Sequence, residues 1–177
     1  MSEGQLIVVT GVMAAGKSTV AQALALRFER GVHVRGDAFR RFVVSGREDM
    51  SGEPSDEAFA QLRLRYRLGI QAAQGYCEAG FTTVLQDVVI GPMLGEFVDM
   101  IDTRPFSLVV LAPDVDEVAR REAARPKTGY GGITPAALDT VLRTETPQLG
   151  LWVDSTELTV DQTVDHVLDH LDAAAIR

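Results

Sequence analysis

Residues 6–19 read LIVVTGVMAAGKST, and this stretch decides the fold. Its first part, residues 6–10, is a short apolar run rich in β-branched side chains, typical of a strand buried on both faces of a parallel sheet. Residues 11–18 then fit the pattern G-x-x-x-x-G-K-[ST] at every fixed position, and helical spacing follows. A strand, a glycine-rich turn and a helix in this order let backbone N–H groups surround a diphosphate. The stretch therefore predicts an α/β fold with a phosphate-binding loop.

Side chains of this loop are expected to add contacts to a nucleotide. We expect the Lys17 ammonium to reach the β- and γ-phosphates, the Ser18 hydroxyl to bind Mg²⁺, and Thr19 to contact the α-phosphate. The expected nucleotide-binding residues are Gly11, Val12, Met13, Ala14, Ala15, Gly16, Lys17, Ser18 and Thr19. The alternative is a glycine turn ahead of a surface lysine.

The rest of the chain alternates strands and helices. Short apolar runs typical of buried strands follow at residues 32–34, 82–85, 106–111 and 151–153. Helical patterns lie around them at residues 18–30, 38–44, 56–79, 93–101, after Asp114, from Pro135 and after Thr159. Alternation of this kind predicts one domain over residues 1–177, with a five-stranded parallel sheet covered by helices on both faces.

Composition excludes several classes of protein. Hydrophobic residues make up 46% and charged residues 24%, which is typical of a globular domain and not of a disordered chain. The 17 Lys and Arg against 25 Asp and Glu give a net charge of −8, which disfavours general nucleic-acid binding. The single cysteine, Cys77, allows no intramolecular disulfide and is expected in the core. We expect neither a signal peptide nor a membrane span, and hence a cytoplasmic location; the oligomeric state stays open.

Two carboxylates follow predicted strands, where open α/β sheets bind their ligands. Asp37 comes directly after the second strand, where it can orient an acceptor hydroxyl and accept its proton, or simply cap a helix. Asp87 comes after the third strand, where it can bind Mg²⁺ through water, hold the acceptor, or be an ordinary turn residue. We assign Asp37 to the acceptor and Asp87 to the metal, because Asp37 lies nearer the variable residues 38–80.

Arginines are the candidate partners of the transferring phosphoryl group. Arg121 and Arg125 are spaced for one helix face and can neutralise its charge, although Glu117 and Arg121 also form a standard surface pair. By contrast, the arginines of the long third helix are expected as solvated surface charge; they are Arg63, Arg65 and Arg67.

In these residues the chain resembles the P-loop kinases of the nucleoside-kinase type, especially the chloramphenicol phosphotransferase-like and zeta-toxin-like branches. Asp37 in HVRGDAFRR matches the aspartate that contacts the acceptor hydroxyl there. Gln86-Asp87-Val88 retains only the second acid of an Asp-Asp-Val-like segment, and VARREAARPKTGYGG supplies the arginines of a lid, residues 120–133. The resemblance implies strand order 2-3-1-4-5, ATP and Mg²⁺, and a small-molecule hydroxyl acceptor bound by residues 38–80, with antibiotics among the candidates.

Two other functions stay open at this point. One is a nucleotide kinase with a phosphate as acceptor, and the other is a nucleotide-driven switch or ATPase module. The sequence has no Asn-Lys-x-Asp segment, which disfavours a GTPase. Val88 stands after Asp87, where many motor ATPases use a glutamate to activate water.

Overall fold

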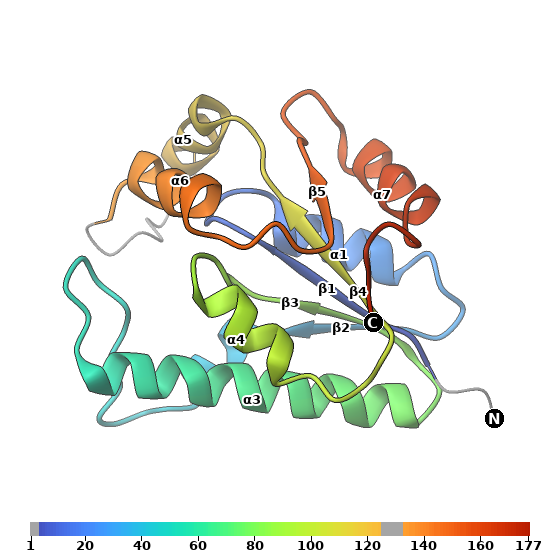
Figure 1. The fold of residues 1–177 in the computed structure, drawn as a ribbon, viewed down its shortest axis with the longest axis horizontal. Coiled ribbons are helices and arrows are strands. Elements are labelled where there is room, and N and C mark those ends of the chain that lie inside the picture. Colours follow the sequence, from blue (N-terminus) through green and yellow to red (C-terminus); the bar gives the residue numbers. More distant parts are fainter. Residues whose placement is uncertain (1–3, 125–132) are drawn as a thin grey trace.

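Strands of this protein form one sheet, in the order β2-β3-β1-β4-β5, with β6 paired to β4 (Figure 1). The computed structural model describes residues 4–124 and 133–177. The strands are β1 Leu6–Gly11, β2 Gly31–Arg35, β3 Thr82–Gln86, β4 Phe106–Leu111, β5 Leu151–Val153 and β6 Ala175–Ile176. The first five pair in parallel, which confirms the predicted fold class and strand order. The antiparallel β6 is an addition that the sequence pattern did not predict.

Helices cover both faces of the sheet (Figure 1). They are α1 Lys17–Ala25, α2 Gly36–Arg41, α3 Asp56–Glu78, α4 Met93–Asp99, α5 Val115–Ala123, α6 Pro135–Thr144 and α7 Val160–Asp169. The α1 and α7 helices pack together on one face, whereas α3 lies across the other. Among the described residues, no helix is both long enough and apolar enough to cross a membrane.

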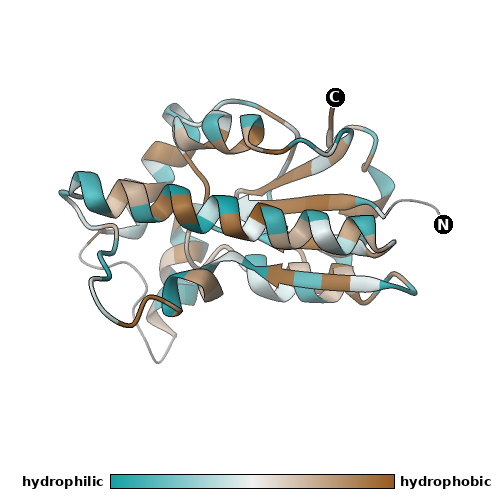
Figure 2. Cartoon of the chain, turned by 90° about the horizontal axis from the view of Figure 1, so that it is seen from below, coloured by the Kyte–Doolittle hydropathy of each residue, from teal (hydrophilic) through white to brown (hydrophobic). Residues whose placement is uncertain are grey.

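The core is centred on β1 and β4, every residue of which is buried. The two strands are neighbours, with Ile7 in register with Ser107, and helices cover their faces. Figure 2 shows hydrophobic residues along the strands behind an amphipathic α3. Parallel strands end at the same edge of a sheet. The buried centre therefore positions the polar residues that follow β1, β2 and β3 at that edge.

Local contacts set the end of α1 and the starts of α5 and α7. The α1 helix ends at Ala25, earlier than the predicted Arg30, because the chain turns back tightly there: a Cβ on Gly31 would lie 1.8 Å from the Ala25 carbonyl oxygen. At the start of α5, Asp114 accepts from the Asp116 N–H, while Glu117 turns to nearby arginines. The α7 helix starts after Thr159 as expected, and Thr159 and Gln162 form a capping box there.

Candidate active site

The loop between β1 and α1 has the backbone of a tight phosphate-sized turn. Gly11 has φ +142° and Gly16 has φ +91°, and a Cβ on Gly11 would lie 2.4 Å from the Leu111 carbonyl oxygen. Ala14, with φ 63°, is in the left-handed region without being glycine, which strains the loop by about 1 kcal/mol. Gly16 gives the first turn of α1 no side-chain cap, and an uncapped helix N-terminus favours an anion.

Two side chains at the start of α1 point back to the loop and to β3. Lys17 is only 6% exposed, and its ammonium donates to the Val12 carbonyl oxygen at 2.6 Å. The Ser18 hydroxyl donates to the Gln86 amide oxygen at 3.0 Å. Gln86 is thus a site residue that sequence reasoning had noted only as the place of a missing acid. The sequence signal for Gln86 is its position directly before Asp87. Side chains at consecutive strand positions point to opposite faces of the sheet, so the two residues serve different faces.

Asp87 faces the other side of β3, toward α3. Its two carboxylate oxygens accept from Arg65, Nε at 3.0 Å and Nη2 at 2.6 Å, and Oδ1 also accepts from the Val88 N–H. The side chains of the pair are 4% and 15% exposed. Burial raises the pKa of the Asp87 carboxyl, and the charges of Arg65 and Lys17 oppose that shift.

The expectation that Arg65 is surface charge was therefore wrong. Its helix neighbours Arg63 and Arg67 fit that description better, because Arg63 makes a half-exposed pair with Glu96 and Arg67 is exposed. The segment that carries Asp87 is also fixed: the Tyr66 hydroxyl donates to the Val88 carbonyl oxygen at 2.8 Å.

Asp37 lies beside this buried pair but stays accessible. It is in the first turn of α2, its side chain is 39% exposed, and it forms an ion pair with Arg41. The preceding residue touches Asp87, since a Cβ on Gly36 would lie 2.1 Å from the Asp87 carboxylate. The structure thus brings Asp37 and Asp87 together at the carboxyl edge, one exposed and one buried.

Arg121 connects α5 to the loop. Its guanidinium binds Glu117 at 2.6 Å and approaches the carbonyl oxygens of Ala15 and Ser155, each at 3.4 Å. Hydrogen bonds from Arg120 and Arg121 lower the pKa of Glu117 to about 2. Arg120 itself points outward, with its side chain 75% exposed. Arg125 and most of the expected lid lie outside the described residues.

A cavity of about 520 Å³ opens beside the loop, between Thr19 of α1, Arg121 and residues 155–160. Ser155 is 3% exposed, and its hydroxyl has no hydrogen-bond partner in the described part of the chain. A buried hydroxyl without a partner is costly unless a ligand or water binds it. Within the same described ranges, no group of three or more His, Cys, Asp and Glu side chains could hold a metal.

Solved structures of several kinases share this fold. A sugar kinase from Janibacter sp. has a TM-score of 0.70 at 18% identity, covering 97% of this chain and 96% of that chain. An APS kinase from Mycobacterium tuberculosis, in complex with AMPPNP and APS, has a TM-score of 0.64 at 19% identity, covering 97% and 99%. The tunicamycin resistance protein of Deinococcus radiodurans has a TM-score of 0.65 at 13% identity, covering 98% and 99%.

The resemblance to P-loop kinases is thereby confirmed for the fold. No curated protein matches the chain. A family match to the AAA domain (AAA_33) spans residues 6–147, which is more than half of the chain and includes the loop, Asp37, Asp87 and Arg121. With this match, the phosphate-binding loop and the strand order in agreement, the chain belongs to the AAA domain family of P-loop proteins.

Proposed function

We propose that this protein is an ATP-dependent phosphotransferase that moves the γ-phosphate to a hydroxyl group of a small molecule. The observation that carries the proposal is the meeting of loop 11–18, Asp37 and Asp87 at one carboxyl edge of the sheet. Ligands of open α/β sheets bind at this edge. The fold's kinase neighbours, one of them a complex with AMPPNP, support nucleotide use, and ATP fits the cytoplasmic location expected from the sequence.

The nucleotide would lie along the loop and the cavity beside it. Backbone N–H groups of residues 11–19 and the Lys17 ammonium would hold the phosphates, since the helix N-terminus and the lysine charge both favour anions. The base and ribose would enter the cavity between Arg121 and residues 155–160, where the Ser155 hydroxyl offers a hydrogen bond.

Transfer itself would use Asp37. The acceptor hydroxyl oxygen forms a bond to the γ-phosphorus, the bond from that phosphorus to the β–γ bridging oxygen breaks, and ADP leaves. The hydroxyl proton passes to the Asp37 carboxylate, which is accessible beside its Arg41 partner. Lys17, Arg121 and Arg125 would neutralise the transferring group, with Arg125 belonging to the proposed lid, residues 120–133. Residues 38–80 would bind the acceptor.

Mg²⁺, when bound, would neutralise charge on the β- and γ-phosphates. The Ser18 hydroxyl and its partner Gln86 present two oxygens next to the loop, which suits a hard cation. Asp87 would act through water, because Arg65 already binds both of its oxygens.

The test is ADP release from Mg-ATP, measured with and without a panel of sugars, antibiotics, nucleosides and nucleoside monophosphates. We expect release to depend on a hydroxyl acceptor and to be lost in Lys17→Ala. Arg27→Ala is the matched control, because it removes a cation that pairs with Asp165 on the surface. ADP release at the same rate without any acceptor would support the ATPase alternative, and release only with monophosphates would support a nucleotide kinase.

A further inference from the structure

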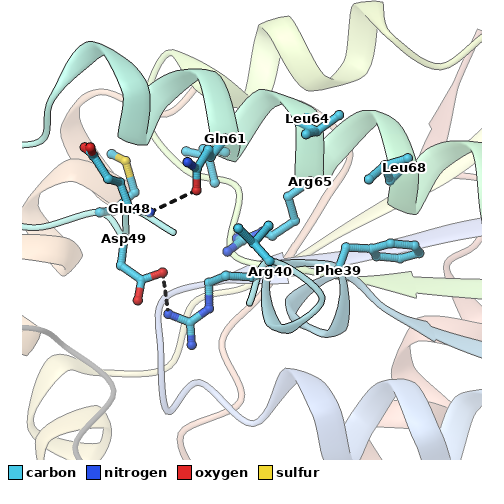
Figure 3. Close-up of a pocket in the computed structure, with 11 residues that line it drawn as sticks. Phe39, Arg40, Glu48, Asp49, Gln61, Leu64, Arg65 and Leu68 are labelled. Carbon is cyan, nitrogen blue, oxygen red and sulfur yellow. Dashed lines mark hydrogen bonds and ion pairs between the residues drawn. The ribbon is translucent and has the colours of Figure 1, made fainter. Parts of the chain in front are cut away.

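A second cavity lies between α2, α3 and the connecting residues 43–50, and most of its lining is apolar (Figure 3). The apolar side chains that line it are Phe39, Val43, Met50, Leu62, Leu64 and Leu68. Phe42, which packs edge-on against the lining residue Phe39, is 73% exposed, and its neighbour in sequence Val44 is 96% exposed. Large hydrophobic side chains gathered at one exposed place mark a binding surface.

The cations of the lining already have carboxylate partners. Arg40 binds Asp49 at 2.9 Å, and Arg65 binds Asp87 through two hydrogen bonds. Figure 3 shows Arg40 turned to Asp49, with Glu48 beside it at the same end of the cavity. An anionic ligand here would meet the carboxylates of Glu48 and Asp49, and to gain an arginine it would have to displace Asp49 from Arg40 or Asp87 from Arg65. The charges of the lining therefore favour an uncharged ligand.

One residue of the lining, Arg65, links the cavity to the proposed site of transfer. Arg65 lines the cavity and binds Asp87 at its other end. Asp87 touches the start of α2, in whose first turn Asp37 lies. The cavity therefore lies one side chain away from the carboxyl edge of the sheet at which Asp37 and Asp87 lie.

The cavity is small in this structure. Its volume is about 50 Å³, whereas pockets for drug-sized ligands have roughly 300–1,000 Å³. Residues 43–50 form a cover over the cavity, and Gln61 of α3 binds this cover. Gln61 accepts from the Glu48 N–H at 2.9 Å and donates to the Gly46 carbonyl oxygen at 2.8 Å. The Arg40–Asp49 ion pair and a hydrogen bond from the Ser55 hydroxyl to Glu48 also hold this segment. All of these contacts lie at the surface, so residues 43–50 can move outward at modest cost.

We infer that this cavity takes the body of the acceptor and that the acceptor is an uncharged alcohol with a hydrophobic body. The inference rests on the proposed phosphotransferase function and names the substrate class for it. This acceptor class separates the protein from kinases whose acceptors carry phosphate, sulfate or carboxylate groups, because such groups are bound by arginine and lysine side chains that are free to pair with them.

The experiment compares two probes that differ only in charge, naphthylethanol and its phosphate monoester. Binding is followed by fluorescence anisotropy of the naphthyl group, with loop 11–18 saturated by Mg-AMPPNP so that the ester cannot bind there. We expect the alcohol to bind at least about tenfold more tightly than the ester. Leu64→Glu should weaken alcohol binding by about tenfold, since it places a charge in the apolar lining. Leu26→Glu is the matched control, because Leu26 is an exposed leucine away from the cavity.

Equal or tighter binding of the ester would overturn the inference, and so would alcohol binding that is absent or unchanged in Leu64→Glu. AMPPNP binding is measured separately in every variant. Failure to bind AMPPNP in the wild type would overturn the proposed function, and the acceptor class with it. Normal AMPPNP binding without alcohol binding would overturn the acceptor class alone.

Discussion

Replacing Arg65 by methionine should destabilise the protein strongly, because it leaves the Asp87 carboxylate buried without its partner. The two side chains are 15% and 4% exposed and joined by two hydrogen bonds. Removing one member of a buried ion pair costs about 3–5 kcal/mol of unfolding free energy. The double variant Arg65→Met, Asp87→Leu should recover much of this loss, since no buried charge remains.

The loss should depend on pH in a direction set by Asp87. Burial already raises the pKa of this carboxyl, and loss of Arg65 removes the largest opposing charge. Relative to an unfolded pKa of about 3.9, each further pH unit adds at most about 1.4 kcal/mol to the penalty, up to the folded pKa. The penalty of the buried charge is therefore smaller near pH 5 than near pH 7. The variant should therefore regain stability as the pH falls.

Urea unfolding at the two pH values measures this, with Arg63→Met as the matched control. Arg63 occupies the same helix and also binds a carboxylate through two hydrogen bonds, but its pair with Glu96 is about 40% exposed on each side. Exposed pairs contribute little to stability, so the control should unfold close to the wild type at both pH values. Equal effects of the two substitutions, or a loss in Arg65→Met that does not change with pH, would refute the burial argument.

Three further predictions concern transfer and the cover of the acceptor cavity. Arg121→Ala should lower kcat by roughly 10²–10³-fold, whereas Arg120→Ala, which removes a 75% exposed side chain, should leave kcat nearly unchanged; steady-state ADP release measures both. Gln61→Ala should raise hydrogen exchange at residues 46–49, and unchanged protection would mean that other contacts hold this segment. Asp37→Asn should keep ATP binding in calorimetry but lower transfer by roughly 10²–10⁴-fold; undiminished transfer would remove Asp37 from the role of base.

The parts of the structure that the sequence predicted well are the local ones. The strand ends and the loop follow from residues adjacent in the chain, since β-branched runs, glycines and a lysine act within a few positions of one another. Asp37 and Asp87 could be placed at one edge for the same reason, because each directly follows a strand. The two-residue β6 is too short to have a sequence pattern, and its pairing with β4 depends on the direction in which the chain leaves the last helix.

Arg65 shows what local patterns could not predict. At about 100° per residue, Arg63 and Arg67 lie on one flank of the apolar face of α3 and Arg65 on the other. The three are equivalent until it is known which flank turns to β3. That choice depends on the packing of α3 against the sheet, where Arg65 meets Asp87 from 22 residues away. Long-range docking of this kind leaves no mark in residue spacing.

The same pair offers a physical reason for acceptor selectivity. Arg65 both lines the acceptor cavity and neutralises Asp87. A ligand that binds the Arg65 guanidinium therefore leaves the buried Asp87 carboxylate without its partner. Breaking such a pair costs at least about 3 kcal/mol, a factor of roughly 10² in affinity, which an anionic acceptor would have to regain from its own contact with Arg65. An uncharged alcohol leaves the pair intact and needs only apolar contact with the lining. By holding Arg65, Asp87 therefore disfavours the entry of an anionic acceptor.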